Sequence, residues 1–442
     1  MSIKELDSPL INFNSLHKLW AGRKRSAHAV MTVIKIDAAY RKTAKKVVAL
    51  SCSLAESQKL YKKTHEENAQ RLYDLCHDNG GSWAKFGQFL SARPDLLPRE
   101  YIKALEPLQN DISPTPFAEL EPLLTDQLGG DWRELFSKVN EEPIATASIG
   151  QVHKATLKDG RKVAVKIQLP HIKKLFSQDV ILFRILAKLL SNRIPQIDLS
   201  NMVGYLLKTI SEELDFTNEA SNITAFGKLH HIPGVKVPTL IAELSTEKVI
   251  TTEWIQGVRL VDYLKRTFGD KQKKILYLLQ NSYMQQAMWH GIYQGDPHPG
   301  NFLVDRDANL HILDYGYMGR LTPTETANFS RLIMVITQNS HEDMLTVLND
   351  SGFEGLTEEM FQGKSLTMIE SMSGMNRSGG GAQIDVVISA LLEQFRENRI
   401  TVPDYFISVG RVFITVGGLL RTYDVPFNIM SNEIVTFGKT ER

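Results

Sequence analysis

The sequence has few cysteines, almost no net charge and no recognisable secretory signal. These absences argue against a disulfide-rich protein, a nucleic-acid-binding protein and a secreted protein. Its two cysteines, Cys52 and Cys76, are too few for a disulfide framework and stand in no Cys-x-x-Cys or Cys/His metal-binding pattern, which favours a reducing compartment. A formal net charge of +1 over 442 residues argues against nucleic acid as a partner of the whole molecule. The first residues lack the basic, apolar and small-residue order of a secretory signal.

Long apolar runs are also missing. No stretch approaches the ~20 consecutive apolar residues that a membrane-spanning helix requires. The longest candidates, residues 47–54 and 412–420, are short, and Gly417 and Gly418 interrupt the second. We therefore expect a cytoplasmic protein, with peripheral attachment at the inner membrane surface as the open alternative.

One segment near the N-terminus is strongly basic although the whole chain is not. Residues 18–46 carry nine Lys or Arg residues against Asp37 as the one acidic residue, and their apolar residues recur at helical spacing. Such a helix is either a solvated outer face or an anchor for anionic lipid, and the sequence leaves both interpretations open.

The hydrophobic pattern changes twice along the chain and predicts an α+β protein. Residues 1–140 are mostly helical, and Gly80-Gly81 interrupts them. Residues 141–257 contain a strand pair at 154–168 around an Asp-Gly turn, a long helical region to about residue 228, and a second strand pair at 236–254. Residues 258–442 are helical apart from a short strand pair at 302–304 and 310–313. We expect a helical extension, a small strand-rich lobe and a helical lobe with these boundaries.

The stretch Gln294-Gly295-Asp296-Pro297-His298-Pro299-Gly300-Asn301 holds an Asp and an Asn five residues apart on a stiff loop. A strand pair follows and then Asp314-Tyr315-Gly316. Asn301 and Asp314 offer the oxygen ligands that Mg²⁺ prefers, and Asp296 could position or deprotonate an attacking hydroxyl group. An isolated Asp-Tyr-Gly is usually a turn, but the two motifs together predict phosphoryl transfer with magnesium.

A lysine upstream completes this pattern. Strand alternation places Lys166 and Ala164 on one face of Val163-Ala164-Val165-Lys166 and the two valines on the other. A lone strand lysine is usually a solvated edge residue, but here a loop at residues 145–152 precedes it and an acidic helix follows it, as in the nucleotide-binding lobe of a kinase. The carboxylate that would pair with it could be any of four acidic residues: Glu212, Glu213, Asp215 and Glu219. Of these, Asp215 and Glu219 are four residues apart and would share one helix face.

Several motifs in fixed order resemble the AarF/UbiB family, also called the ABC1 or ADCK atypical kinases. They are Ala-x-Ala-Ser-x-x-Gln at 145–151, Val-Ala-Val-Lys ending at Lys166, Glu-Leu-Asp-Phe-x-x-Glu-Ala-x-Asn at 213–222, Asp-Pro-His-Pro-Gly-Asn at 296–301, Asp-Tyr-Gly at 314–316, and Lys-x-Gly-Gln at 85–88. The motifs lie between about residues 80 and 320, and outside that span only helical character matches. The resemblance implies a two-lobed protein-kinase-like fold with ATP and Mg²⁺ as cofactors.

The resemblance also implies a role for each matching residue. Lys166 would contact the nucleotide phosphates and pair with Glu219, Asp296 would take the catalytic-loop role, and Asn301 and Asp314 would bind Mg²⁺. Residues covering the phosphates would be Ala145, Ala147, Ser148 and Gln151. The strand that ends at Glu253-Trp254-Ile255 would present backbone groups to adenine, so Glu253 and Ile255 would be cofactor-binding residues. The helix of Lys85 and Gln88 would lie over the active site, with Lys85 meeting Glu213 and Asp215.

These roles favour an unusual kinase. Alanines replace the glycines of a typical phosphate-covering loop, so the loop should be stiffer, and the helix of Lys85 would occlude a peptide substrate. We expect an ATPase or a small-molecule or lipid kinase that supports isoprenoid quinone (ubiquinone) biosynthesis or membrane lipid homeostasis. A protein kinase and a nucleotide-binding pseudokinase scaffold are the alternatives. Expected partners are a nucleotide, a membrane surface or isoprenoid lipid, and quinone-biosynthesis proteins, but no nucleic acid.

Two departures from the family pattern weaken parts of this interpretation. Gln294-Gly295 stands where the family usually has His-Ala, which leaves the support of the catalytic loop in question. The stretch from Tyr405 to Met430 is too short and too interrupted for the transmembrane pair of bacterial ubiquinone-biosynthesis members.

Overall fold

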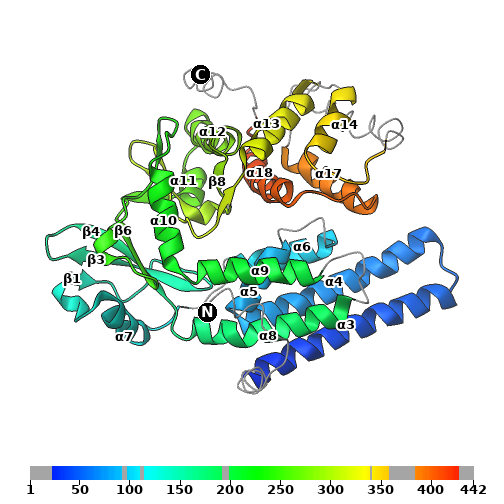
Figure 1. Cartoon of the computed structure of the whole chain (residues 1–442), viewed down its shortest axis with the longest axis horizontal. Helices are drawn as coiled ribbons and strands as arrows, with labels where there is room; N and C mark the ends of the chain where they lie inside the picture. The colour runs from blue at the N-terminus through cyan, green and yellow to red at the C-terminus, as the bar shows by residue number, and fades with distance from the viewer. Residues whose placement is uncertain are drawn as a thin grey trace. The chain divides into compact units, whose positions relative to one another are not determined.

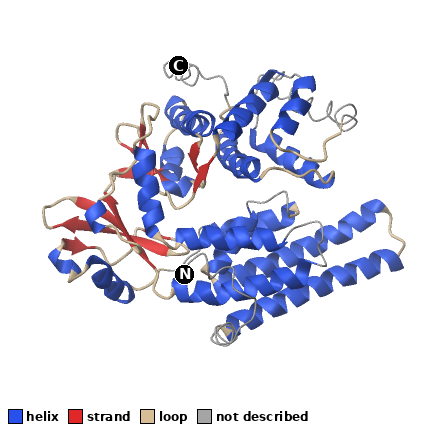
Figure 2. Cartoon of the chain, viewed as in Figure 1, coloured by secondary structure: helices blue, strands red, loops and turns tan. Residues whose placement is uncertain are grey.

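The computed structural model describes residues 22–91, 97–109, 114–191, 199–338, 341–357 and 384–427 (Figure 1). The chain divides into two units, residues 1–218 with 241–252 (unit 1) and residues 219–240 with 253–442 (unit 2). Both contain helices and antiparallel strands (Figure 2), so the expected α+β class is confirmed. The three-part division at residues 140 and 257 stays a prediction.

Unit 1 begins with a long helical hairpin, α3 (Arg23–Ala49) and α4 (Leu54–Asn79). The second helix starts with a capping box, in which the Ser53 side chain accepts a bond from the Glu56 amide and the Glu56 carboxylate accepts one from the Ser53 amide. Gly80 ends α4 at positive φ, as the sequence predicts. Shorter helices follow: α5 (Ser82–Ser91), α6 (Arg99–Leu105), η1 (Glu106–Gln109), α7 (Phe117–Leu128) and η2 (Trp132–Glu134).

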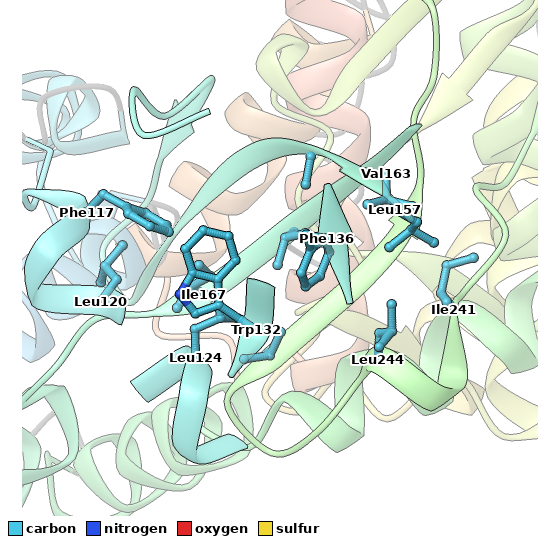
Figure 3. Packing of buried hydrophobic residues seen from close by; sticks show 13 residues of the cluster. Phe117, Leu120, Leu124, Trp132, Phe136, Leu157, Val163, Ile167, Ile241 and Leu244 are labelled. Atoms are coloured by element: carbon cyan, nitrogen blue, oxygen red, sulfur yellow. The ribbon is translucent and has the colours of Figure 1, made fainter. Parts of the chain in front are cut away.

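A five-stranded sheet forms the other part of unit 1. Its strands are β1 (Phe136–Val139), β2 (Ala145–Thr146), β3 (Gly150–Leu157), β4 (Lys162–Gln168) and β6 (Val249–Glu253), in the order β1-β3-β4-β6 with β2 beside β3. The predicted hairpin at 154–168 is confirmed, with Gly160 at positive φ in its turn. One sheet face is apolar, and Figure 3 shows Val163 and Ile167 of β4 with Phe117, Leu120 and Leu124 of α7 in one buried cluster.

The long helical region expected up to about residue 228 is confirmed over the described residues, where it consists of three helices. They are α8 (Ile172–Ser191), α9 (Leu199–Glu213) and α10 (Phe216–Gly227). The last break has a local cause, because the Asp215 carboxylate accepts bonds from the amide and the hydroxyl of Thr217 and so begins a new helix. Glu213 therefore ends α9 and Glu219 lies in the first turn of α10.

Unit 2 contains a four-stranded sheet in the order β5-β10-β9-β7 and a two-stranded sheet of β8 and β11. The strands are β5 (Val235–Lys236), β7 (Gly257–Arg259), β8 (Ile292–Gln294), β9 (Phe302–Asp305), β10 (Leu310–Ile312) and β11 (Met318–Arg320). The pair at 302–304 and 310–313 is confirmed, but the pair expected at 236–254 was wrong. Its first strand, β5, is parallel to β10, and a short helix, η3 (Ala242–Leu244), separates it from β6 in the other sheet.

Within the described residues, unit 2 contains further helices in addition to α10. They are α11 (Leu260–Arg266), α12 (Asp270–Gln285), the π-helical turn η4 (Gln286–His290), η5 (Pro299–Asn301), α13 (Pro323–Gln338), α14 (His341–Asp350), α17 (Ile384–Glu397) and α18 (Asp404–Thr422). Within the described ranges, no helix is both long and apolar enough to cross a bilayer.

Candidate active site

The loop from Gly295 to Asn301, which we call the catalytic loop after the role that the resemblance implies, connects β8 to β9. A hydrogen bond joins its predicted catalytic residue, Asp296, to its predicted metal ligand, Asn301. Asp296 is exposed, and its carbonyl accepts a 3.0 Å bond from Nδ2 of Asn301. The His298 ring accepts a 3.1 Å bond from the amide of Gly300, which fixes the short helix η5. Since Asn301 uses its amide nitrogen within the loop, its oxygen Oδ1 remains the atom suited to a metal ion.

Asp314 is brought to the same loop by the end of β10. The amide of Leu313 donates a 2.9 Å bond to the carbonyl of Asn301, so the next residue, Asp314, follows directly beside the loop. One carboxylate oxygen of Asp314 accepts a 2.8 Å bond from the Gly316 amide. An amide oxygen and a carboxylate are the hard ligands that Mg²⁺ prefers, so this donor set fits the expected cofactor.

The side chain of Gln294 links the loop that contains Asp296 to the Asp-Tyr-Gly motif at residues 314–316. This buried side chain accepts bonds from the Tyr283 hydroxyl (2.6 Å) and the Asp296 amide (3.1 Å), and it donates to the carbonyls of Asp296 (2.8 Å) and Asp314 (3.3 Å). Its own amide donates to the Gln286 side chain at 2.9 Å. Complete burial raises the pKa of Tyr283 well above its usual value, so the phenol stays a donor. Gln294 thus supplies the loop support that the departure from His-Ala left in question.

Helix α18 also contacts the catalytic loop. The Arg411 guanidinium donates a 2.6 Å bond to the carbonyl of Gly295 and lies over the Tyr317 ring, 5.0 Å from its centre. A Cβ at Gly295 would meet the Tyr317 ring at 2.2 Å, so only glycine permits this approach. The hydroxyls of Tyr317 and Tyr293 both contact the Ser408 side chain. The residue before Asp296 is therefore held by a helix that lies more than a hundred residues later in the sequence.

Glu219 lies at the Asp-Tyr-Gly motif. Its side chain is buried, and a Cβ on Gly316 would lie 3.7 Å from its carboxylate and 3.2 Å from that of Asp314. Asn222, one turn later in α10, donates a 3.0 Å bond to the carbonyl of Tyr315 and accepts one from Arg320. Two carboxylates thus converge on one glycine, an arrangement that a cation would stabilise.

Lys166 lies in β4 of unit 1, where the structure confirms the predicted alternation. Val163, Val165 and Ile167 are buried in the core, whereas Lys166 is half-buried on the opposite face and pairs with Val152 of β3. Its ammonium group lies 5.2 Å from the centre of the Phe216 ring, an attractive cation–π distance. The pairing of Lys166 with Glu219 stays a prediction.

The alanine-rich loop is the turn of the β2–β3 hairpin. Ala145 pairs with Val152, and the Ala147 amide donates a 2.8 Å bond to the carbonyl of Gly150, so the turn that contains Ser148 is closed tightly. Ser148 is buried. This closure agrees with the stiffness expected of a loop without glycine at positions 145, 147 and 148.

Gln151 has a different environment from the one that the resemblance suggests. It faces the core side of β3, opposite to Lys166, and its amide exchanges two 2.9 Å bonds with the backbone of Thr115. Its amide nitrogen also lies 2.9 Å from the His153 ring. This placement supports a role in holding the segment before α7 and not a direct contact with a nucleotide.

The Lys-x-Gly-Gln motif fixes α5 by three different means. Lys85 forms a 2.6 Å ion pair with Glu213 at the end of α9, the pair that the resemblance implies. A Cβ at Gly87 would meet Leu108 at 2.2 Å, so glycine allows α5 to pack closely on η1. Gln88 donates a 3.0 Å bond to the Leu108 carbonyl. Asp215, the second expected partner of Lys85, caps α10 as described above.

The expected adenine-binding strand ends at Glu253. The Glu253 carboxylate accepts bonds from the amide and hydroxyl of Thr239, and its amide donates to the Thr239 carbonyl. Ile255 is half-buried in the following loop. The side chain of Glu253 thus fixes the strand end, and the adenine contact expected of the backbone at Glu253 and Ile255 stays a prediction.

Sequence reasoning missed the residues that position the loop. Gln294 stood out only as a departure from the family, and nothing in the local pattern pointed to Tyr283, Gln286, Ser408 or Arg411. Among the described residues no group of three or more His, Cys, Asp or Glu side chains could hold a metal ion, and the roles of Asn301 and Asp314 as magnesium ligands stay predictions.

Comparison with known proteins gives consistent matches. The sequence model of the ABC1 atypical kinase-like domain matches residues 107–348. AarF domain-containing protein kinase 1 of Xenopus laevis is 32% identical over 70% of this chain and 61% of its own length. An uncharacterized Clostridium pasteurianum protein encoded in the hydrogenase 1 5′ region is 35% identical over 66% of this chain and 55% of its own. This chain thus spans a little more than half the length of these two relatives.

A solved structure supports the same conclusion on the fold. Mycobacterium tuberculosis Rv3197, in a complex with erythromycin, superposes with a TM-score of 0.57 at 27% identity, over 86% of this chain and 98% of that one. Together with the matched domain, this similarity confirms the expected kinase-like α+β fold.

Proposed function

Because the chain belongs to the ABC1 atypical kinase-like family, we propose that it binds ATP with Mg²⁺ and cleaves or transfers the terminal phosphate. The observation that carries the proposal is the tie between Asp296 and Asp314 through Gln294, with Asn301 bonded to the same loop. Phosphoryl transfer depends mainly on positioning and electrostatics, and here both motifs share one rigid support.

Each residue has a role in this proposal. Asn301 and Asp314 would hold Mg²⁺, which neutralises charge on the nucleotide phosphates. Asp296, exposed at the loop, orients the attacking hydroxyl group or water. By the family resemblance, Lys166 would bind phosphate oxygens from its strand and would pair with Glu219.

We further propose that the phosphate acceptor is water or a small or lipid-like molecule and not a protein. The support is the Lys85–Glu213 ion pair, whose two side chains are only 24% and 10% exposed, together with the close packing at Gly87. These interactions hold α5 in place, and the family resemblance puts this helix where a peptide substrate would dock. A role in isoprenoid quinone or membrane lipid metabolism fits such an acceptor, and it rests on the resemblance alone.

The test follows the terminal phosphate of labelled ATP in the presence of Mg²⁺ and native membranes. Asp314→Asn should lower the release or transfer of label by about 10²–10³-fold, because it removes one charge-stabilising group from the site. Label found only as free phosphate indicates an ATPase, and label in a lipid extract identifies a lipid kinase. Turnover that is equal in wild type and variant would contradict the proposal and favour the scaffold alternative.

A second variant separates the protein-kinase alternative. Lys85→Met should loosen α5, and label on protein should then appear or rise if this helix excludes peptides. Lys103→Met, an exposed lysine on the neighbouring helix α6, is the matched control. Strong protein labelling by the wild type would mean that α5 does not exclude protein substrates.

A further inference from the structure

The turn between α3 and α4 has an unusual surface. No residue from Arg41 to Lys63 is buried, and the nearest buried side chain on α4 is Thr64. The last polar contact between the two helices joins the hydroxyls of Thr43 and Thr64 at 2.6 Å. Residues 41–63, which we call the arm, thus form a two-helix projection at the end of the hairpin (Figure 1).

The apex of the arm is apolar and exposed. Val48, Leu50 and Leu54 have relative exposures of 78%, 61% and 76%, which are among the highest values of any large apolar side chains in the described residues. The turn that presents them is well ordered by hydrogen bonds, since the Ser53 capping box begins α4 and the Cys52 amide donates to the carbonyl of Val47. Three exposed apolar side chains on a defined turn indicate a surface that is covered by another phase or molecule.

The flanks of the arm are strongly basic. Seven Lys or Arg residues lie between positions 41 and 63, against Glu56 as the one acidic residue: Arg41, Lys42, Lys45, Lys46, Lys59, Lys62 and Lys63. All seven are exposed. At a rise of ~1.5 Å per residue, Lys46 and Lys59 lie within ~10 Å of the apex along their helices. Apolar residues at the tip with cations one or two turns behind match the depth of a bilayer interface.

We propose that the arm docks on an anionic membrane surface, with Val48, Leu50 and Leu54 entering the interface and the lysines binding lipid headgroups. The proposal is independent of the catalytic function. A nucleic acid would satisfy the lysines but would leave the apolar apex against phosphates and water, so the combination favours a bilayer.

The test uses the full-length chain and flotation with two kinds of vesicle, pure phosphatidylcholine and phosphatidylcholine with ~30% phosphatidylserine. Wild type should bind the anionic vesicles, and binding should fall as salt rises. Two triple variants, Val48→Ser with Leu50→Ser and Leu54→Ser, and Lys45→Gln with Lys46→Gln and Lys59→Gln, should each lower binding at least tenfold. Neither set touches a buried residue, and circular dichroism checks that both fold.

A matched control separates the arm from general charge. Lys271, Lys273 and Lys274 at the start of α12 are exposed, and changing all three to Gln alters the net charge by the same amount. This control should bind vesicles within about twofold of wild type. Equal losses in both lysine variants would overturn the proposal, because any basic surface would then suffice.

Insertion of the apex can be measured directly. Cys52 lies at the turn and is partly exposed, whereas Cys76 is fully buried, so a polarity-sensitive fluorophore should label Cys52 selectively. Its emission should shift to the blue on anionic vesicles and not on phosphatidylcholine alone. An unshifted spectrum would contradict insertion of the apex into the membrane. Tight binding to RNA or DNA that is unchanged by the three serine substitutions would instead indicate a polyanionic partner.

Discussion

The two units use different chemistry to hold their functional residues. In unit 1, ion pairs join the helices: Lys85 binds Glu213, and Arg25 binds the buried Asp179, which also accepts a bond from Trp83. In unit 2, neutral groups make most of the bonds that hold the catalytic loop, namely the amides of Gln294, Gln286 and Asn301 and the phenol of Tyr283. The Arg411 guanidinium adds a charged donor to the Gly295 carbonyl, but no ion pair is among the bonds described for this loop.

The difference indicates how each unit responds to its surroundings. The free energy of an ion pair changes with protonation, with salt and with a competing charge, whereas an amide network keeps its donors and acceptors at every physiological pH. The helical part of unit 1 is therefore suited to control by charge, and the loop of unit 2 is suited to constant geometry. Three experiments test this contrast.

The largest expected effect is on the stability of unit 1. Burial raises the pKa of Asp179, although Arg25 opposes that shift, so Arg25→Ala leaves a carboxylate with 3% exposure without its cation. We expect a loss of about 3–5 kcal/mol in the free energy of unfolding at pH 7, measured by urea denaturation. Arg41→Ala removes a pair with Asp37 on the same helix α3, but Arg41 is 61% exposed, and its loss should cost about 0.5 kcal/mol.

A double variant tests whether the unpaired charge of Asp179 causes the loss of stability in Arg25→Ala. Adding Asp179→Asn to Arg25→Ala removes the unpaired charge and should restore at least half of the lost stability. If Arg25→Ala cost no more than Arg41→Ala, the ion pair would not hold the helices and the contrast between the units would fail.

The second effect concerns turnover in unit 2. Gln294→Glu keeps the acceptor for Tyr283 but places an oxygen against the carbonyls of Asp296 and Asp314. A mispaired buried group of this kind costs about 1–3 kcal/mol, so kcat for ATP turnover should fall about 10–100-fold with a smaller change in KM. Gln294→His, which restores the residue usual in the family, should recover part of the rate.

Gln285→Glu is the matched control. Gln285, at the end of α12, is buried like Gln294. Its side chain forms hydrogen bonds with the backbones of Ile232 and His230 and not with the catalytic loop. It should lower stability by a similar amount and leave kcat near wild type. A parallel fall of kcat in both variants would mean that Gln294 acts only through general stability.

The smallest expected effect concerns a carboxylate in unit 2 that holds a turn outside the catalytic loop. Desolvation opposes the shift, but bonds from His311, Asn309 and Asp307 hold the pKa of Asp305 well below its usual value. Because the native pKa is depressed, this carboxylate stabilises the fold fully at neutral pH, and the contribution is lost as pH falls below about 4.

At pH 7, Asp305→Asn should have a lower free energy of unfolding than wild type in urea denaturation. This difference should shrink by about 1 kcal/mol when the pH is lowered to 3. Asp307→Asn, an exposed change in the same turn, is the control. A deficit that stayed constant over this pH range would show that the charge of Asp305 does not support the turn.

The sequence predicted the parts of the fold that depend on local pattern. Alternation gave the face of Lys166 correctly, and the Asp-Gly turn gave the β3–β4 hairpin, because both depend on residues next to each other in the chain. Val235-Lys236 was assigned to the wrong partner strand, because the choice between sheets depends on β10, about 75 residues later.

The catalytic loop shows the same limit. Asp296, Asn301 and Asp314 were found because their spacing and chemistry are characteristic, whereas the Lys85–Glu213 pair followed from family resemblance and not from spacing. Arg411 could not be found in either way. Its bond goes to a backbone carbonyl, which carries no residue-specific signal, and it begins on a helix far along the chain.

Helix α18 limits where the chain can be divided into separate functional fragments. The region matched by the family ends at residue 348, whereas Ser408 and Arg411, which brace the loop through Tyr293, Tyr317 and the carbonyl of Gly295, lie beyond it. Gly295 and Gly319 accept those two tyrosine rings only because they lack a Cβ. The region that matches the family model, residues 107–348, therefore lacks the helix that supports its own catalytic loop. The two glycines, the two tyrosines and helix α18 depend on one another for packing, so a chimera that took them from different relatives would assemble a catalytic loop without these contacts.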